Sequence, residues 1–226
     1  MFQDTNHRMV GHNIFGFDLP YLVTSTTKYE VKGDPFFLPR GNYWHQMFYD
    51  TMKKTYMPTT YGTMIGLDAL SKTFGFEGKS GNGKNFYLLP RAEQESYLEN
   101  DLRQSQNIFR KENNSWNICD DNQYTVFDIE TAPLPDEEII RVAPTFDPDK
   151  VKLGNLKDPE KIEQKIESAR DNHYISIIEG AGLDPRYSKP YAIGYIHDGE
   201  SMELDFSEPT ELLQRFWEVC KNNLTK

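Results

Sequence analysis

Short runs of apolar residues, one of them with clear apolar–polar alternation at 124–130, recur along this chain and predict β-strands. The predicted strands are residues 8–13, 43–52, 124–130, 191–196 and 202–206. The last two form a predicted hairpin with its turn at Asp198 and Gly199, because Asp-Gly pairs accept the positive φ angles of tight hairpin turns.

Apolar residues spaced three or four positions apart predict helices between these strands. The predicted helices start at Asp18 and near Pro209 and cover residues 66–74 and 93–111. Asp18 is expected to be the N-cap of the helix that starts there, and Gly75 is expected to end the helix over residues 66–74. Alternation of strands and helices predicts the α/β class.

Two segments interrupt these patterns. Residues 112–122 carry no clear period and predict a linker between a first part, 1–111, and a second part, 123–226. Residues 147–170 form a strongly charged insertion, in which Asp158 and Pro159 begin a helix whose narrow apolar stripe predicts an exposed element.

The charge is distributed unevenly along the chain. The 226 residues include 25 Lys and Arg against 35 Asp and Glu, for a net charge of -10. Residues 28–111 contain 12 basic and 9 acidic residues, whereas residues 112–226 contain 12 basic and 24 acidic ones. The first part can therefore carry a local basic surface for nucleic acid, although a solvated acidic face is the simpler interpretation of the charge alone.

Several classes of protein are not supported by the sequence. It has no apolar run of membrane-spanning length and no signal pattern at Met1, so we expect a soluble cytoplasmic protein without membrane contact. Two cysteines cannot form a disulfide framework, and the five histidines lack zinc-finger spacing. A phosphate-binding loop at Gly78 would need glycine at position 73, which is threonine.

The most informative motif is the predicted strand that contains Asp128 and Glu130. Side chains alternate along a strand, so both carboxylates point to one face while Phe127 and Ile129 point to the other. Two carboxylates on one face of an apolar strand are costly unless a cation lies between them, and Mg²⁺ prefers such oxygen ligands. A solvent-facing edge strand is an equally good explanation of this motif alone.

Two further acidic motifs lie earlier in the chain. Asn13 to Asp18 spans a turn bounded by Gly11 and Gly16, where a strand passes into a helix. Tyr97 and Asp101 are four residues apart on a predicted helix and therefore share a face. Each of these motifs is also a common structural pattern when taken singly.

Together, Asp128-Ile129-Glu130, Asn13 to Asp18 and Tyr97 to Asp101 resemble the three motifs of the DEDD superfamily of DnaQ-like 3′–5′ exonucleases. The tyrosine matches the type found in proofreading domains of family-B DNA polymerases. The stretch 67–83 is similar to the one between the last two motifs in stand-alone relatives of that domain.

This resemblance implies a single exonuclease domain over residues 1–226 with a ribonuclease-H-like fold, a mixed five-stranded sheet flanked by helices. In the family the Asp-x-Glu strand comes first, whereas here it follows the other two motifs. The sequence therefore looks circularly permuted, with the family's usual ends joined through the linker. Permutation is tolerated when the original termini lie close together on the surface.

The resemblance also implies two-metal hydrolysis with Mg²⁺ or Mn²⁺ as cofactor. The catalytic residues would be Asp128, Glu130, Asp101, Asp18 and Tyr97. Among them, Asp128, Glu130 and Asp101 would hold the metal that activates water, Asp128 would bridge to a second metal, and Asp18 would act near that second metal. Tyr97 would orient the attacking water through its hydroxyl group.

The expected substrate is the 3′ end of single-stranded DNA, with RNA as the alternative. Thr131, Asn13 and Phe17 are expected to contact the terminal nucleotide, and Lys79, Lys84 and Arg91 are candidates for phosphate contacts. A non-catalytic nucleic-acid-binding or protein-interaction module on the same fold is the competing hypothesis, with the acidic insertion as its docking surface.

Overall fold

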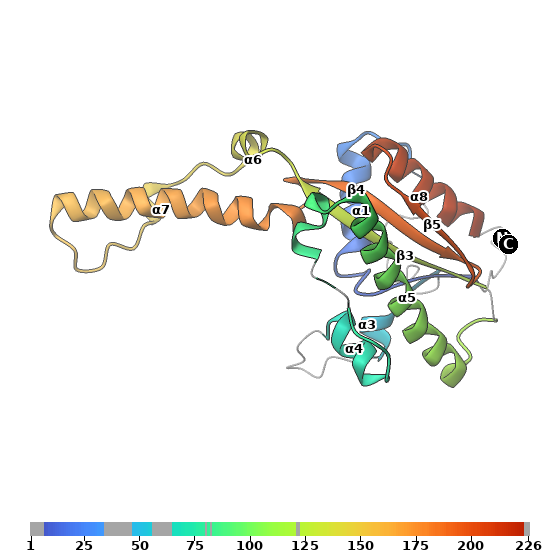
Figure 1. The fold of residues 1–226 in the computed structure, drawn as a ribbon. Coiled ribbons are helices and arrows are strands. Elements are labelled where there is room, and N and C mark those ends of the chain that lie inside the picture. The colour runs from blue at the N-terminus through green and yellow to red at the C-terminus, as the bar shows by residue number, and fades with distance from the viewer. Residues whose placement is uncertain are drawn as a thin grey trace. The chain divides into compact units, whose positions relative to one another are not determined.

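The computed structural model describes residues 7–33, 47–55, 65–79, 81, 83–120 and 123–223. It contains a five-stranded sheet in the order β2-β1-β3-β4-β5 (Figure 1). The strands are β1 (Arg8–Gly11), β2 (Phe48–Asp50), β3 (Tyr124–Pro133), β4 (Ser188–His197) and β5 (Ser201–Asp205). β1 runs parallel to β2 and β3, whereas β4 and β5 are antiparallel, so the sheet is mixed.

Helices cover both faces of this sheet. They are α1 (Asp18–Lys28), α3 (Thr51–Thr55), α4 (Leu67–Thr73), the 3₁₀ segment η3 (Gly83–Leu88), α5 (Arg91–Trp116) and α8 (Pro209–Asn223). α1 and α8 pack on one face and α5 on the other (Figure 1). This α/β arrangement confirms the predicted class and is compatible with a ribonuclease-H-like fold.

Strand alternation decides which side chains each face receives. On β3, Phe127 and Ile129 enter the core under α1 and α8, while Val126 belongs to the core under α5. Asp128 and Glu130 follow Val126 in the same two-residue period. The two carboxylates therefore lie on the α5 side of the sheet, where that helix can contribute further ligands.

The predicted hairpin is confirmed. The backbone N–H of Glu200 donates to His197 O at 3.0 Å, and Asp198 and Gly199 have φ angles of 47° and 78°. Positive φ at both central positions is the twist that two-residue hairpin turns require.

Contacts divide the chain into two compact units, residues 1–131 with 190–226, and residues 132–189. The second unit contains α6 (Asp136–Val142), η4 (Pro148–Lys150), α7 (Pro159–Gly180) and η5 (Ala181–Leu183) around a small core that includes Ile139 and Tyr187. The Asp158 side chain caps α7 by accepting from the Glu160 N–H, and no residue of α7 is buried, so the predicted exposed helix is confirmed.

Several predicted boundaries are wrong. Asp18 does not cap α1: it is the first helical residue, and no side chain in the described part of the structure caps that end. The helix predicted to end at 111 continues to Trp116, so part of the predicted linker is helical. The strand predicted over 43–52 is β2, which ends at Asp50, while residues 43–46 lie outside the described part of the chain.

The longer α5 has a physical explanation in Asn113. Its side-chain oxygen accepts hydrogen bonds from the N–H groups of Ile118 and Cys119 at 2.8 and 2.9 Å, and its amide donates to Cys119 O at 3.0 Å. Asn117 ends the helix with a left-handed φ of 50°. Asn113, a polar residue that interrupts the apolar spacing of the helix, therefore holds the segment after the helix in place.

Among the described residues, no helix is both long enough and apolar enough to span a membrane.

Candidate active site

Three of the predicted carboxylates converge. Asp128 and Glu130 come from β3 and Asp101 from α5, and one oxygen of each lies within 4.8 Å of the other two. Asp101 is 3% exposed, whereas Asp128 and Glu130 are partly exposed. The strand and the helix thus build an acidic group in which two of the three carboxylates remain partly exposed to solvent.

Burial and mutual repulsion change the proton affinity of this group. Burial, with the Asp101 charge, raises the pKa of Asp128 to about 7. Burial and the charges of Asp128 and Asp101 raise the pKa of Glu130 well above its usual range, and burial also raises that of Asp101. Carboxylates that resist ionisation in this way are the groups that a cation would stabilise most.

Lys79 contributes a positive charge to the same place. Its ammonium group donates to Asp101 Oδ2 and lies 3.2 Å from the Tyr97 hydroxyl oxygen. Burial opposes the charge on Lys79, but the Asp101 carboxylate outweighs it, so that the pKa of Lys79 is raised. Lys79 was expected only to bind phosphates, and its place beside Asp101 could not be read from the sequence.

The donor set fits a hard divalent cation. All three groups are carboxylates, and their separation of up to 4.8 Å is near the ~4.2 Å between opposite ligands of an ion with ~2.1 Å bonds. Asp101 Oδ1 is buried and has no hydrogen-bond partner among the described residues. A buried carboxylate oxygen without a donor is costly, and a metal ion would satisfy it.

Asp18 lies next to this group without belonging to it. It is buried at the start of α1, and burial and the Asp128 charge raise its pKa well above the usual value. The Ile129 backbone donates a hydrogen bond that favours its charged form. The structure thus brings Asp18 within electrostatic reach of Asp128, while the group of three within the described part of the chain consists of Asp101, Asp128 and Glu130.

Tyr97 lies one helical turn before Asp101 on α5, as its spacing predicts. Its ring is buried against Phe86, and Lys79 Nζ lies 5.4 Å from the ring centroid. Burial and the Asp101 charge raise its pKa to about 12. Its hydroxyl therefore keeps its proton near neutral pH and can donate to a water molecule or a phosphate oxygen.

The turn that carries Asn13 is held by a residue that sequence reasoning missed. Fully buried Asp50, at the end of β2, accepts hydrogen bonds from the backbone N–H groups of Asn13 at 2.9 Å and Phe15 at 3.0 Å. Asn13 itself has a left-handed φ of 61°. The available signal was a carboxylate at the carboxyl end of a strand that pairs in parallel with β1. Functional sites of α/β sheets commonly lie at the carboxyl ends of parallel strands.

The other residues predicted to contact the nucleotide or its phosphates do not form a single group with the carboxylates in the described part of the structure. Phe17 is partly buried with its ring 5.5 Å from that of Tyr21, and Thr131 follows Glu130 on β3. The Arg91 guanidinium lies 3.7 Å from the centre of the Phe206 ring, which gives it a structural partner. The side chain of Lys84 lies outside the described part of the structure.

Comparisons with protein-family models, with curated proteins and with solved structures found no match for this chain.

Proposed function

We propose that this chain is a metal-dependent exonuclease that removes nucleotides from the 3′ end of single-stranded DNA. The observation that carries the proposal is the convergence of Asp101, Asp128 and Glu130 beside Tyr97, with a buried oxygen of Asp101 that has no donor among the described residues. The motif resemblance supplies the reaction class, and the geometry supports it by bringing the three carboxylates within 4.8 Å of one another.

Asp101, Asp128 and Glu130 would hold a divalent ion, with Asp18 on the side of a second one. When bound, such ions supply positive charge that promotes deprotonation of water and stabilises the leaving 3′ oxygen. Hydrolysis joins the water oxygen to phosphorus and breaks the bond to the 3′ oxygen of the preceding nucleotide, which takes up a proton. The products are a nucleoside 5′-monophosphate and a shortened strand.

The chain's own residues would orient the reactants. The Tyr97 hydroxyl, protonated near neutral pH, donates a hydrogen bond that holds the attacking water in line with the scissile bond. The turn from Asn13 to Phe17, fixed by Asp50, would support the terminal nucleotide through hydrogen bonding and stacking, and Thr131 lies next to the acidic strand segment.

The same proposal includes a permuted chain order. Its support is that Thr125 Oγ1 lies 3.0 Å from His7 Nε2 and 3.1 Å from Asn223 Nδ2. Residues near both ends of the described chain therefore meet at one buried threonine of β3. A direct connection between α8 and β1 would be short, as the family's usual order requires.

The test is degradation of 5′-labelled single-stranded DNA, and separately RNA, with Mg²⁺, Mn²⁺ or EDTA. We expect a ladder that shortens from the 3′ end, requires metal and is absent with Asp128→Asn. Equal activity of Asp128→Asn and the parent would refute the site. Degradation of RNA alone would change the substrate, and binding of either polymer without cleavage in any metal would favour the non-catalytic module.

A further inference from the structure

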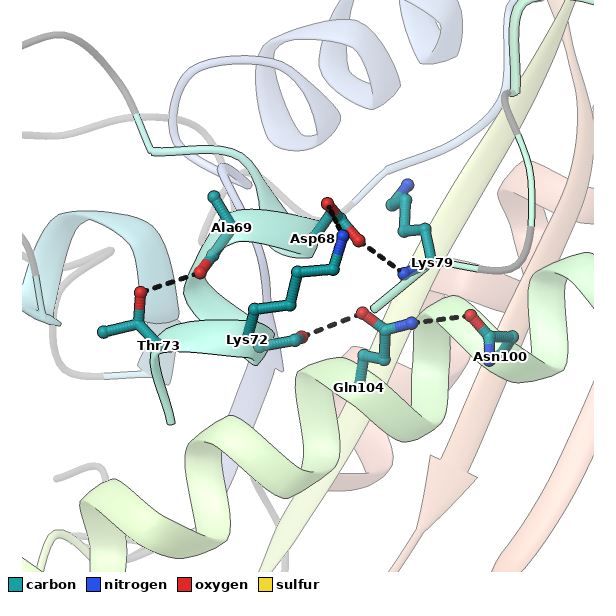
Figure 2. Close-up of polar contacts among 8 residues, drawn as sticks. Asp68, Ala69, Lys72, Thr73, Lys79, Asn100 and Gln104 are labelled. Carbon is teal, nitrogen blue, oxygen red and sulfur yellow. Dashed lines mark hydrogen bonds and ion pairs between the residues drawn. The ribbon is translucent and has the colours of Figure 1, made fainter. Parts of the chain in front are cut away.

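The segment that carries Lys79 is fastened to α4 by Asp68. Asp68 Oδ1 accepts a hydrogen bond from the backbone N–H of Lys79 at 2.8 Å, and Oδ2 accepts from Lys72 Nζ at 2.8 Å (Figure 2). A Cβ atom at Gly78 would collide with both the Asp68 carboxylate and the Lys72 side chain. Glycine at this position lets both side chains keep these contacts, and the hydrogen bond from the Lys79 N–H to Asp68 holds the backbone of Lys79.

α4 is in turn fixed to the helix that carries Asp101. Buried Ser71 donates to Gln104 Oε1 at 2.8 Å. Gln104 in turn donates to Asn100 Oδ1 at 2.6 Å (Figure 2). Leu67 and Leu70 of α4 pack against Ile108 of α5. A continuous set of contacts therefore relates Asp68 to the position next to Asp101.

From this frame the Lys79 side chain reaches into the acidic group. Its ammonium bonds to Asp101 Oδ2 and lies within hydrogen-bond distance of the Tyr97 hydroxyl oxygen, while Asp101 Oδ1 has no partner among the described residues. The ammonium therefore occupies one oxygen of the same carboxylate whose other oxygen a divalent cation would use. Two cations at one carboxylate repel each other, so they compete for it.

We propose that Lys79, positioned by Asp68, is a built-in counter-cation of the acidic site that must leave Asp101 when a divalent ion binds. This inference rests on the proposed metal site and adds a regulatory property to it. In the metal-free state Lys79 compensates the carboxylates and keeps the site folded. In the metal-loaded state the displaced ammonium lies at the rim of the site, where it can form an ion pair with a phosphate group of the substrate.

The test is the affinity for Mn²⁺, measured by electron paramagnetic resonance of the free ion without any nucleic acid. Lys79→Met retains the aliphatic stem and removes the charge, and we expect it to bind Mn²⁺ about tenfold more tightly than the parent. Lys79→Arg, which keeps the charge, is expected to stay within about threefold of the parent. Asp68→Ala, a change at a partly exposed helix position, should tighten Mn²⁺ binding about threefold by releasing Lys79.

Lys161→Met is the matched control, because Lys161 pairs with Asp158 at 3.9 Å and belongs to the other compact unit. Its Mn²⁺ affinity should equal that of the parent. Unchanged or weaker binding by both Lys79→Met and Asp68→Ala, with normal binding by the parent, would overturn the inference and leave the exonuclease proposal standing. Absence of Mn²⁺ binding by the parent and by Lys79→Met alike would remove the metal site and both proposals with it.

Discussion

The carboxylate of Asp50 accepts a hydrogen bond from the backbone N–H of Asn13 at 2.9 Å, and this contact joins the end of β2 to the turn that opens α1. The same carboxylate accepts from the N–H groups of Phe15, Met52 and Lys53 at 3.0, 3.0 and 3.3 Å. One buried side chain thus satisfies donors from two segments far apart in the sequence. The motif from Asn13 to Asp18 owes its shape to a residue outside it.

Replacing Asp50 with alanine should therefore destabilise the protein and reduce nuclease activity together. Loss of the acceptor removes a partner from four backbone N–H groups that are buried or partly buried, and we expect a cost of about 3 kcal/mol in the free energy of unfolding. Urea unfolding monitored by circular dichroism would measure it. Asp50→Asn keeps one acceptor oxygen and should lose less; an equal loss in both variants would show that the charge, rather than the hydrogen bonds, is what matters.

Much of the sheet was accessible from the sequence because alternation depends only on local pattern and burial. The hairpin at Asp198 and Gly199, the face shared by Asp128 and Glu130, and the spacing of Tyr97 and Asp101 all follow from residue periods. These features need no knowledge of what lies across the core.

The roles of Asp50 and Lys79 depend instead on tertiary contacts that no local pattern encodes. Asp50 closes a β2 strand of three residues, and Lys79 belongs to a glycine-rich segment with no period. Asn113 misled the prediction of the helix end for a related reason: a polar side chain that bonds the residues after the helix looks like a breaker until those residues are placed.

Gly83 should be intolerant of alanine because of its contact with Tyr97. A Cβ atom there would lie 2.9 Å from the Tyr97 hydroxyl oxygen, whereas a Cβ at Gly66 would meet nothing within 4 Å. We expect Gly83→Ala to lower the rate of degradation about tenfold through displacement of that hydroxyl. Gly66→Ala is the matched control, with activity and thermal midpoint unchanged. Parental activity in Gly83→Ala would argue that the Tyr97 hydroxyl has no positional role.

Glu112 should make stability depend on pH. Burial raises the pKa of this carboxyl group from 4.5 to about 8, so between these values the folded state binds more protons than the unfolded state. The stability that this group contributes is present below pH 4.5 and is lost as the pH rises through 8. Glu112→Gln should remove that loss and exceed the parent by on the order of 2 kcal/mol at pH 9, with little difference at pH 5.

The measurement is the difference in unfolding free energy between Glu112→Gln and the parent across that pH range. Taking the difference cancels the contribution of the acidic site, whose carboxylates also have raised pKa values. Glu211→Gln, which removes one negative charge at an exposed position in the first turn of α8, is the matched control for the substitution itself. A flat difference for Glu112→Gln would mean that its carboxyl group titrates as it does in the unfolded chain.

Tyr97→Phe and Asp128→Asn should distinguish the orientation of the attacking water from the binding of metal. Phenylalanine keeps the ring packed against Phe86 and removes only the hydroxyl, so we expect single-turnover cleavage to slow by about 10- to 100-fold with Mn²⁺ affinity retained. Asp128→Asn removes a negative charge from the proposed ligand set and should lower both the cleavage rate and the Mn²⁺ affinity, with cleavage reduced by at least about 10³-fold. A Tyr97→Phe loss as large as that of Asp128→Asn would assign the hydroxyl an essential part in the chemistry.

A chain rewired into the family's order should fold to the same sheet. The new chain would begin between Asp120 and Gln123, pass from Lys226 directly into Met1 and end after α5. His7 and Asn223 already meet at Thr125, so the new connection spans a short distance, and the cut preserves the contacts that Asn113 makes with Ile118 and Cys119. Permutation at such sites retains native packing. We expect the far-ultraviolet circular dichroism spectrum and the metal-dependent activity of the parent. A control chain cut between Leu102 and Arg103 would interrupt α5 within the core, and we expect it to lose the parent's circular dichroism spectrum and its activity. An equal loss of spectrum and activity in the chain cut between Asp120 and Gln123 would contradict the permuted order.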